Sequence, residues 1–153
     1  MRIVVDSNVL VALAVPTDYS TPALEKVTAW LAQETSLFAP ALWSYEAVSA
    51  IRKFVAAGQL GGAEAAAAVA QILELGIQEV NASEELHRQA LKWAERLGDL
   101  VAYDPAYLAV AESLGAPFWT ADGRLVRKVR ALGVDWIHEI SEPVPAETEG
   151  RKP

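Results

Sequence analysis

The chain has 153 residues, a formal net charge of −7, 52% hydrophobic and 22% charged residues, and no cysteine. This length holds one ordinary domain, and the composition is that of a globular protein rather than a disordered one. The absence of cysteine excludes disulfides, thiolate metal sites and a thiol nucleophile. The acidic balance argues against a protein that coats nucleic acid by charge alone, but it leaves open an enzyme that handles nucleic acid through metal ions.

Export and membrane signals are not apparent in the sequence. The longest apolar runs, such as Val9–Val15, are far shorter than the ~20 residues that a transmembrane helix needs. Asp6 lies inside what would be the apolar core of a signal peptide. We therefore expect a cytoplasmic protein that does not contact a membrane.

Short apolar segments alternate with longer helical patterns in the first half of the chain. The expected elements are, in order, a strand at Ile3–Val5, a short helix at Val9–Ala14, a helix at Ala23–Glu34, a strand at Leu37–Ala39, a helix at Ala41–Ala57, a helix at Ala63–Leu75 and a strand at Ile77–Val80. β-branched apolar triplets are typical of buried parallel strands, and proline or glycine marks most of the helix ends.

The same alternation continues to the last strand. The expected elements are helices at Glu84–Leu97 and Asp104–Leu114, a strand at Phe118–Thr120, a helix at Arg124–Leu132 and a strand at Val134–Ile137. This pattern predicts an α/β fold with three α/β/α layers around a mainly parallel sheet of four to five short strands. Residues 1–140 form the expected domain, and residues 141–153, which are polar and rich in proline and glutamate, form an expected disordered tail.

Four acidic residues occupy positions where α/β folds place their chemistry. Asp6 and Asp122 each follow a strand, Asp104 begins a helix, and Glu46 lies in the helix after the second strand. Function in open α/β sheets gathers beyond the carboxyl ends of the strands, so the four side chains are expected to converge. Clustered carboxylates raise one another's pKa values, and a divalent cation relieves this; oxygen ligands select Mg²⁺ or Mn²⁺.

Each acid also has a purely structural interpretation. Asp104 before Pro105, Asp122 and Asp6 are all plausible helix N-caps or turn residues. Glu46 within a helix would ordinarily be a solvated surface residue. The joint pattern of four acids favours a shared site over four independent structural roles.

Several blocks of the sequence resemble the PIN-domain ribonucleases. The triplet Asp6-Ser7-Asn8 is similar to their opening D-[ST]-N, and residues 40–46 resemble the helix that carries an acidic ligand. Residues 103–111 are close to the block Y-D-A-x-Y-L-A-L-A, and residues 120–125 match T-A-D-x-x-L. The resemblance covers about residues 1–138. The small size is most similar to VapC-type toxins of type II toxin–antitoxin modules.

The resemblance implies a metal-dependent endoribonuclease that hydrolyses RNA phosphodiester bonds. One or two Mg²⁺ or Mn²⁺ ions would be held by Asp6, Glu46, Asp104 and Asp122, with Asp6 and Asp104 as the principal ligands. Residues that would orient these carboxylates are Ser7, Asn8 and Thr120. Basic residues that would contact the RNA backbone are Lys53, Arg124, Arg127 and Lys128, for which a solvated helix face is the alternative.

The resemblance also implies a homodimer and a small antitoxin partner that covers the active-site groove. Two amphipathic helices carry more aromatic side chains than one small core needs, which makes a partner surface plausible. These side chains are Trp30, Trp43, Tyr45 and Phe54. The five tryptophans themselves are expected to fill the core or an interface rather than to stack on bases.

Two other functions compete with the nuclease. A catalytically silent PIN-like module would serve as a scaffold or recognise a partner, and the presence of all four acids argues against it. A haloacid-dehalogenase-type phosphatase also begins with an aspartate after the first strand. It would need a second aspartate two residues later, where this chain has Asn8.

Overall fold

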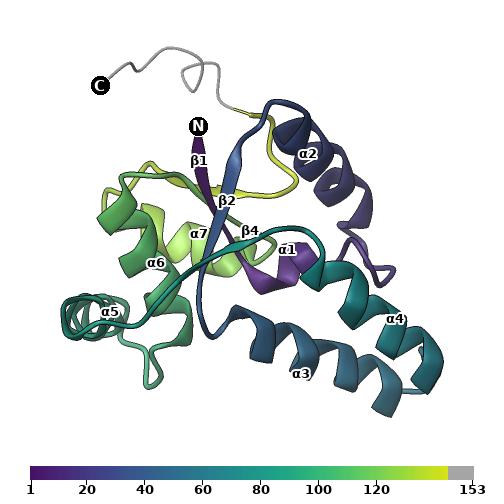
Figure 1. The fold of residues 1–153 in the computed structure, drawn as a ribbon. Coiled ribbons are helices and arrows are strands. Elements are labelled where there is room, and N and C mark those ends of the chain that lie inside the picture. The colour runs from purple at the N-terminus through teal and green to yellow at the C-terminus, as the bar shows by residue number, and fades with distance from the viewer. Residues whose placement is uncertain (145–153) are drawn as a thin grey trace.

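A sheet of five parallel strands forms the centre of the protein, seen in a computed structural model that describes residues 1–144 (Figure 1). The strands are β1 (Arg2–Val5), β2 (Ser36–Pro40), β3 (Gln78–Val80), β4 (Phe118–Thr120) and β5 (Ile137–Glu139). Their order across the sheet is β3-β2-β1-β4-β5, and all neighbours run parallel. The central strand β1 is buried along Ile3, Val4 and Val5, as its β-branched sequence predicts.

Seven helices connect and cover the strands within the described residues. They are α1 (Ser7–Val11), α2 (Ser20–Ala32), α3 (Trp43–Ala56), α4 (Gly62–Leu73), α5 (Glu84–Leu97), α6 (Tyr103–Leu114) and α7 (Gly123–Arg130). None of these helices combines the length and the apolar character needed to cross a bilayer.

The helices lie on both sides of the sheet. Helix α6 packs on β1, β2 and β4, and α5 packs on the outside of α6. Helix α1 packs against β4 and also contacts α2, α3 and α4, which Figure 1 shows on the side away from α5 and α6. The predicted three-layer α/β/α architecture is therefore confirmed. Because all five strands are parallel, their carboxyl ends lie at one edge, and the loops there meet the first turns of α1, α3 and α7.

Two predicted boundaries differ from the structure in ways that matter for the site. The last strand is Ile137–Glu139 and not 134–137, because Gly133 ends the preceding turn with φ +83° and Ile137 is the residue that pairs with Phe118. Helix α6 begins at Tyr103, so Asp104 lies within its first turn and is not its N-cap.

The aromatic residues are mostly buried, as expected for the tryptophans. Trp30 and Trp119 pack with ring centroids 5.5 Å apart, and Tyr107 stacks on Phe118 at 5.6 Å. Of the aromatic surface predicted on two helices, Trp30 and Trp43 are buried and only Tyr45 is largely exposed. The suggested partner surface therefore reduces to this one aromatic side chain.

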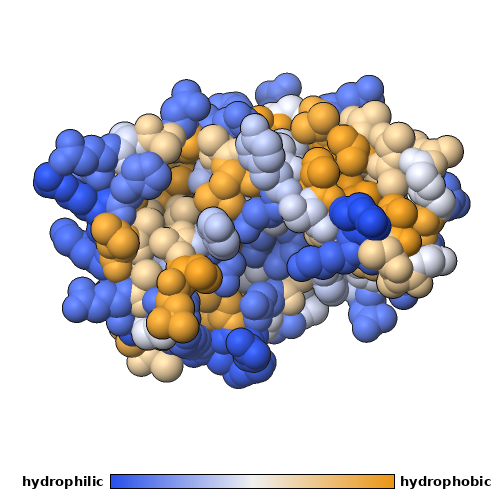
Figure 2. Space-filling model, turned by 90° about the horizontal axis from the view of Figure 1, so that it is seen from below, coloured by the Kyte–Doolittle hydropathy of each residue, from blue (hydrophilic) through white to orange (hydrophobic). Residues whose placement is uncertain are grey.

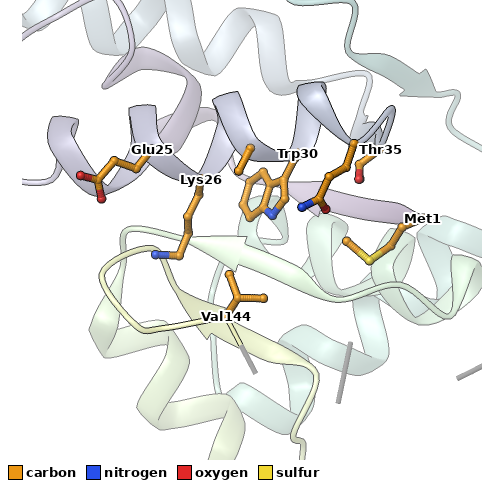
Figure 3. A pocket seen from close by; sticks show the side chains of 8 residues that line it. Met1, Glu25, Lys26, Trp30, Thr35 and Val144 are labelled. Carbon is orange, nitrogen blue, oxygen red and sulfur yellow. The ribbon is translucent and has the colours of Figure 1, made fainter. Parts of the chain in front are cut away.

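The C-terminal part of the predicted tail lies outside the described residues. Within residues 141–144, Glu142 accepts hydrogen bonds from Arg130 at 2.7 Å and from its own loop at the backbone N–H of Glu139. Val144 lines a groove of about 680 Å³ together with residues of α2 and the start of β1, including Lys26 and Met1 (Figure 3).

Candidate functional site

Asp6 is the most buried acid of the site, and four neutral donors hold its carboxylate. It follows β1 directly and is 6% exposed. Thr120 at the end of β4 donates to Oδ2 at 2.6 Å, and the Asn8 amide donates to the same oxygen at 2.9 Å. The Ser7 hydroxyl and the Asn8 backbone N–H donate to Oδ1, each at 3.3 Å. The carboxylate is thereby fixed in orientation.

Asn8 connects the ends of the two central strands. Its amide nitrogen also donates to Thr120 Oγ1 at 3.1 Å, and its Oδ1 accepts from the backbone N–H of Ala121 at 3.0 Å. The Thr120 hydroxyl in turn accepts from the backbone N–H of Asp122 at 3.0 Å. Ser7, Asn8 and Thr120 thus lie where they orient Asp6, and this network ties Asp6 to the loop that carries Asp122.

Glu46 joins α3 to α6. It lies in the first turn of α3, and its Oε2 accepts a hydrogen bond of 2.6 Å from the hydroxyl of Tyr107 on α6. Tyr107 is 1% exposed and stands three residues after Asp104 in the same helix, so this contact brings Glu46 to the first turns of α6. Glu46 is therefore half-buried and turned toward α6, and it is not the fully solvated surface residue that its helical context alone suggests.

Asp122 is the N-cap of α7, which is the structural role predicted for it. Its Oδ1 accepts from the backbone N–H groups of Arg124 and Leu125 at 2.9 and 3.0 Å, which caps α7. Asp6 also caps a helix, through the N–H of Asn8 at the start of α1. Asp104 is different, since no side-chain hydrogen bond or ion pair engages its carboxylate within residues 1–144. Two of the four acids thus have a capping role beside any chemical one.

The acids influence one another electrostatically. Burial, opposed by the hydrogen bond from Thr120 and assisted by the charge of Asp104, raises the pKa of Asp6 to about 6. Burial also raises the pKa of Glu46 to about 7, with further contributions from the charges of Asp6 and Asp104. The pKa of Asp104 is raised by partial desolvation and then by Asp122. The four carboxylates therefore form one chain of like charges, as clustering predicts.

Within residues 1–144, no cationic side chain forms an ion pair with these four acids, although the charge of Lys128 lowers the pKa of Asp104 in part. None of the three ion pairs among residues 1–144 includes Asp6, Glu46, Asp104 or Asp122. The same part of the chain contains no group of three or more histidine, aspartate or glutamate side chains close enough to hold one ion together. The donor chemistry, oxygen ligands with uncompensated charge, fits a hard divalent cation, whereas the side chains as placed do not form a complete coordination shell.

A polar pocket of about 320 Å³ opens beside Asp104. Its lining residues are Asp99, Asp104, Asp122, Arg124, Leu125 and Lys128. Lys128 forms an ion pair with Asp99 across this pocket, and Arg124 takes part in none of the ion pairs within residues 1–144. Two of the four predicted RNA contacts, Arg124 and Lys128, thus lie at the pocket.

The other two predicted RNA contacts lie away from it. Lys53 is in the last turn of α3, seven residues and therefore about 10 Å along the helix from Glu46. Arg127 is exposed in the last turn of α7 and does not line the pocket. Helical spacing predicts that Lys53 and Glu46 lie on nearly the same face of α3. It does not take into account how far apart the two residues are along the helix axis.

Sequence reasoning missed three residues of the site. Tyr107 was quoted only as part of a motif, although its spacing from Asp104 signals a shared helix face. Asp99 is not among the candidate residues identified from the sequence, yet it lines the pocket beside Asp104. Glu139 was placed after the last strand, but it pairs in register with Thr120, and its Oε2 lies only 2.7 Å from where a Cβ on Gly123 would be. A fifth acid therefore ends a strand beside the loop of Asp122.

Comparison with known proteins gives consistent results. The family model of the PIN domain matches residues 3–131. Ribonuclease VapC3 of Pyrobaculum aerophilum is 31% identical over 133 residues, which cover 86% of this chain and 98% of that protein.

Solved structures share the fold at lower identity. PAE2754 from Pyrobaculum aerophilum superposes with a TM-score of 0.65 at 22% identity, covering 92% of this chain and 84% of that one. VapBC2 from Rickettsia felis, bound to a DNA fragment from their promoter, gives a TM-score of 0.63 at 11% identity and covers 91% and 98% of the two chains. These likenesses concern the arrangement of strands and helices.

Proposed function

This chain belongs to the PIN-domain family, and from that premise we propose that it is a metal-dependent endoribonuclease that hydrolyses RNA phosphodiester bonds. The observation that carries the proposal is the set of four carboxylates at one edge of the sheet: the pKa values of Asp6, Glu46 and Asp104 are raised, and none of the four acids forms an ion pair within residues 1–144. The likeness to a protein named as a ribonuclease supports RNA as the substrate.

The acids Asp6, Glu46, Asp104 and Asp122 would hold one or two Mg²⁺ or Mn²⁺ ions. When bound, such an ion supplies Lewis-acid activation of a water molecule and neutralises charge on the phosphoryl oxygens. Asp6 is oriented for this by Thr120 and Asn8. Asp104, whose carboxylate makes no hydrogen bond in the described part of the chain, is free to turn toward a ligand.

The chain's own residues account for the remaining requirements. Glu46, with a pKa of about 7 and a fixed hydrogen bond from Tyr107, is suited to orienting the attacking water and accepting its proton near neutral pH. Arg124 and Lys128 at the pocket would contact phosphates of the RNA backbone and offset part of the negative charge there.

A type II toxin role follows from the same likeness. We place this chain as the toxin of a toxin–antitoxin pair in the cytoplasm, acting as a homodimer and inhibited by a small antitoxin that covers the active-site groove. The likeness to VapC3 and to the VapBC2 structure supports this role. Expression in a bacterial host should arrest growth, and co-expression of a small open reading frame next to its gene should restore it.

A catalytically silent binding module is the second candidate. It is favoured by one observation: no three acids within residues 1–144 stand close enough to share an ion. In this case Asp6 and Asp122 would serve only as helix caps.

Cleavage assays with matched variants separate the two functions. The purified protein should cleave RNA with Mg²⁺ or Mn²⁺ and not with EDTA, and Asp6→Asn, Glu46→Gln and Asp104→Asn should each abolish cleavage. Glu95→Gln, an exposed acid on α5, is the control and should retain activity. Intact RNA with every ion tested, in samples that remain folded, would establish the silent module instead.

A further inference from the structure

Two exposed tyrosines flank the candidate site. Tyr45 is 79% exposed and directly precedes Glu46 in the first turn of α3, and Tyr103 is 62% exposed and directly precedes Asp104 as the first residue of α6. Exposed aromatic rings of this size contrast with the buried tryptophans of the same protein. Their position beside two site acids requires an explanation that core packing does not supply.

A contact between the two helices fixes the first turns of α3 and α6 relative to each other. The Tyr107 hydroxyl on α6 donates to Glu46 on α3 at 2.6 Å. Tyr103 precedes Tyr107 by four residues and therefore lies on the same side of α6, one turn earlier. Tyr45 is the immediate neighbour of Glu46. Both tyrosines thus lie within about one helical turn of this contact along the chain, one on each helix.

The surface between these helices is polar rather than apolar. Figure 2, which looks at the carboxyl edge of the sheet from below, shows a hydrophilic hollow between two groups of hydrophobic residues. The pocket on the α6 side is lined by Asp104 and Asp122 together with Arg124 and Lys128. A partner whose own apolar residues fill the hollow would have to desolvate these charges, whereas a phosphate chain meets cations there and places its bases toward the rim.

Resting on the proposed function, we propose that Tyr45 and Tyr103 are substrate-binding residues that stack on bases of the RNA on either side of the site. Aromatic faces stack on any exposed base, and bases in a duplex are already stacked on one another and unavailable. The two rings therefore select for unpaired nucleotides without reading their identity. They also hold the intervening phosphodiester next to Glu46 and Asp104.

The test compares how tightly the protein binds RNA and a strand of the same length that lacks bases. In Mg²⁺, the Asp6→Asn variant, which should not cleave, is titrated with three labelled probes: an unstructured RNA oligonucleotide, the same strand annealed to its complement, and an abasic ribose-phosphate strand of equal length. Tyr45→Ala and Tyr103→Ala should each weaken binding of the unstructured RNA about 5- to 150-fold, the range found for loss of one base–aromatic stack. Binding of the abasic strand should not change.

Matched substitutions distinguish the contribution of the aromatic ring to RNA binding from the contributions of side-chain volume and of the hydroxyl group. Tyr45→Phe and Tyr103→Phe keep the ring and should bind as the parent does, and the two Leu substitutions should behave like Ala. Leu24→Ala removes a side chain of α2 that is 58% exposed and remote from the site, and it should have no effect. In the otherwise unaltered enzyme, the alanine variants should raise KM with a smaller change in kcat.

Each other outcome is decisive. Unchanged binding of the unstructured RNA, or equal weakening for the abasic strand, would overturn base stacking even if the enzyme cleaves RNA. Loss of antitoxin binding with normal RNA binding would assign the rings to a protein partner instead. Ring-dependent RNA binding by a protein that never cleaves RNA would uphold the stacking and refute the proposed nuclease.

Discussion

The ion-free protein should lose stability as the pH rises from about 5 to about 8. An acid whose pKa is higher in the folded state than in the unfolded chain binds its proton more tightly when folded. Asp6 has this property, because its folded pKa of about 6 exceeds the ordinary value of 3.8. Its contribution is favourable while the carboxyl is protonated and is lost as the pH rises through the folded pKa.

The size of the effect follows from the pKa of Asp6, which is fully buried behind β1. One pKa unit corresponds to about 1.4 kcal/mol, so ionising this carboxyl costs about 3 kcal/mol of folding free energy between strong acid and neutral pH. About half of that, roughly 1.4 kcal/mol, falls between pH 5 and pH 8. Glu46 adds in the same direction, because its pKa is also raised, to about 7.

Urea unfolding in EDTA across this pH range measures the slope directly. Asp6→Asn should flatten it, and combining it with Glu46→Gln should flatten it further. Glu95→Gln on the exposed side of α5 is the matched control and should keep the full slope. The range begins at about pH 5 because the pKa of Glu142 is lowered by Arg130, so Glu142 contributes its opposite effect only in more acidic solution.

Divalent cations should stabilise the protein most at the pH values at which the ion-free protein is least stable. Since protons and cations compete for the same carboxylates, Mg²⁺ or Mn²⁺ should raise the unfolding free energy more at pH 8 than at pH 5. Because burial lowers the pKa of His138, its titration opposes that of Asp6 in this range, and the comparison with Asp6→Asn is decisive. A slope that Asp6→Asn leaves intact in EDTA would show that burial of this acid is not the cause.

Three further substitutions test individual contacts. Tyr107→Phe removes the donor that lowers the pKa of Glu46, so the acidic limb of the pH–activity profile should move to higher pH and stability should fall by about 1 kcal/mol, measured by rate profiles and urea unfolding. Thr120→Val removes the 2.6 Å hydrogen bond to Asp6 and should cost about 1–3 kcal/mol, whereas Thr120→Ser should restore most of it. Arg124→Ala should weaken RNA binding at low salt and reduce the dependence of log Kd on log salt by about 0.7, as expected for one lost phosphate contact to a single strand.

The sequence was sufficient to predict the parallel sheet and the strand ends of the site. Ile3–Val5 and Phe118–Thr120 are apolar triplets that stop at polar residues, and a parallel sheet must bring such ends to one edge. What it could not supply was the direction of side chains on helices. The spacing of α3 is compatible with several rotations, and only the contact between Glu46 and Tyr107 on another helix shows that this acid faces inward.

Errors in the prediction arose where local pattern and tertiary pairing disagree. The segment 134–137 is the more hydrophobic one, yet hydrogen bonding to β4 begins the strand at Ile137 and carries it on to Glu139. Pro105 suggested that Asp104 caps a helix, but α6 starts one residue before this acid, because proline is tolerated throughout a first turn where no N–H is needed.

The magnitudes favour the proposed metal-binding role of Asp6 over a role as a helix cap alone. A carboxylate cap contributes typically about 1 kcal/mol, and a serine or threonine in the same place would contribute a similar amount without a charge. The raised pKa of Asp6 corresponds to a cost of about 3 kcal/mol at neutral pH, and the side chains of Ser7, Asn8 and Thr120 hold its two oxygens in place. A capping role alone does not account for the burial of Asp6, because this burial costs more free energy of folding than the cap contributes to the helix. A residue that must present an ionised, fixed carboxylate to a cation accounts for the burial, the hydrogen bonds and the position at the strand end together.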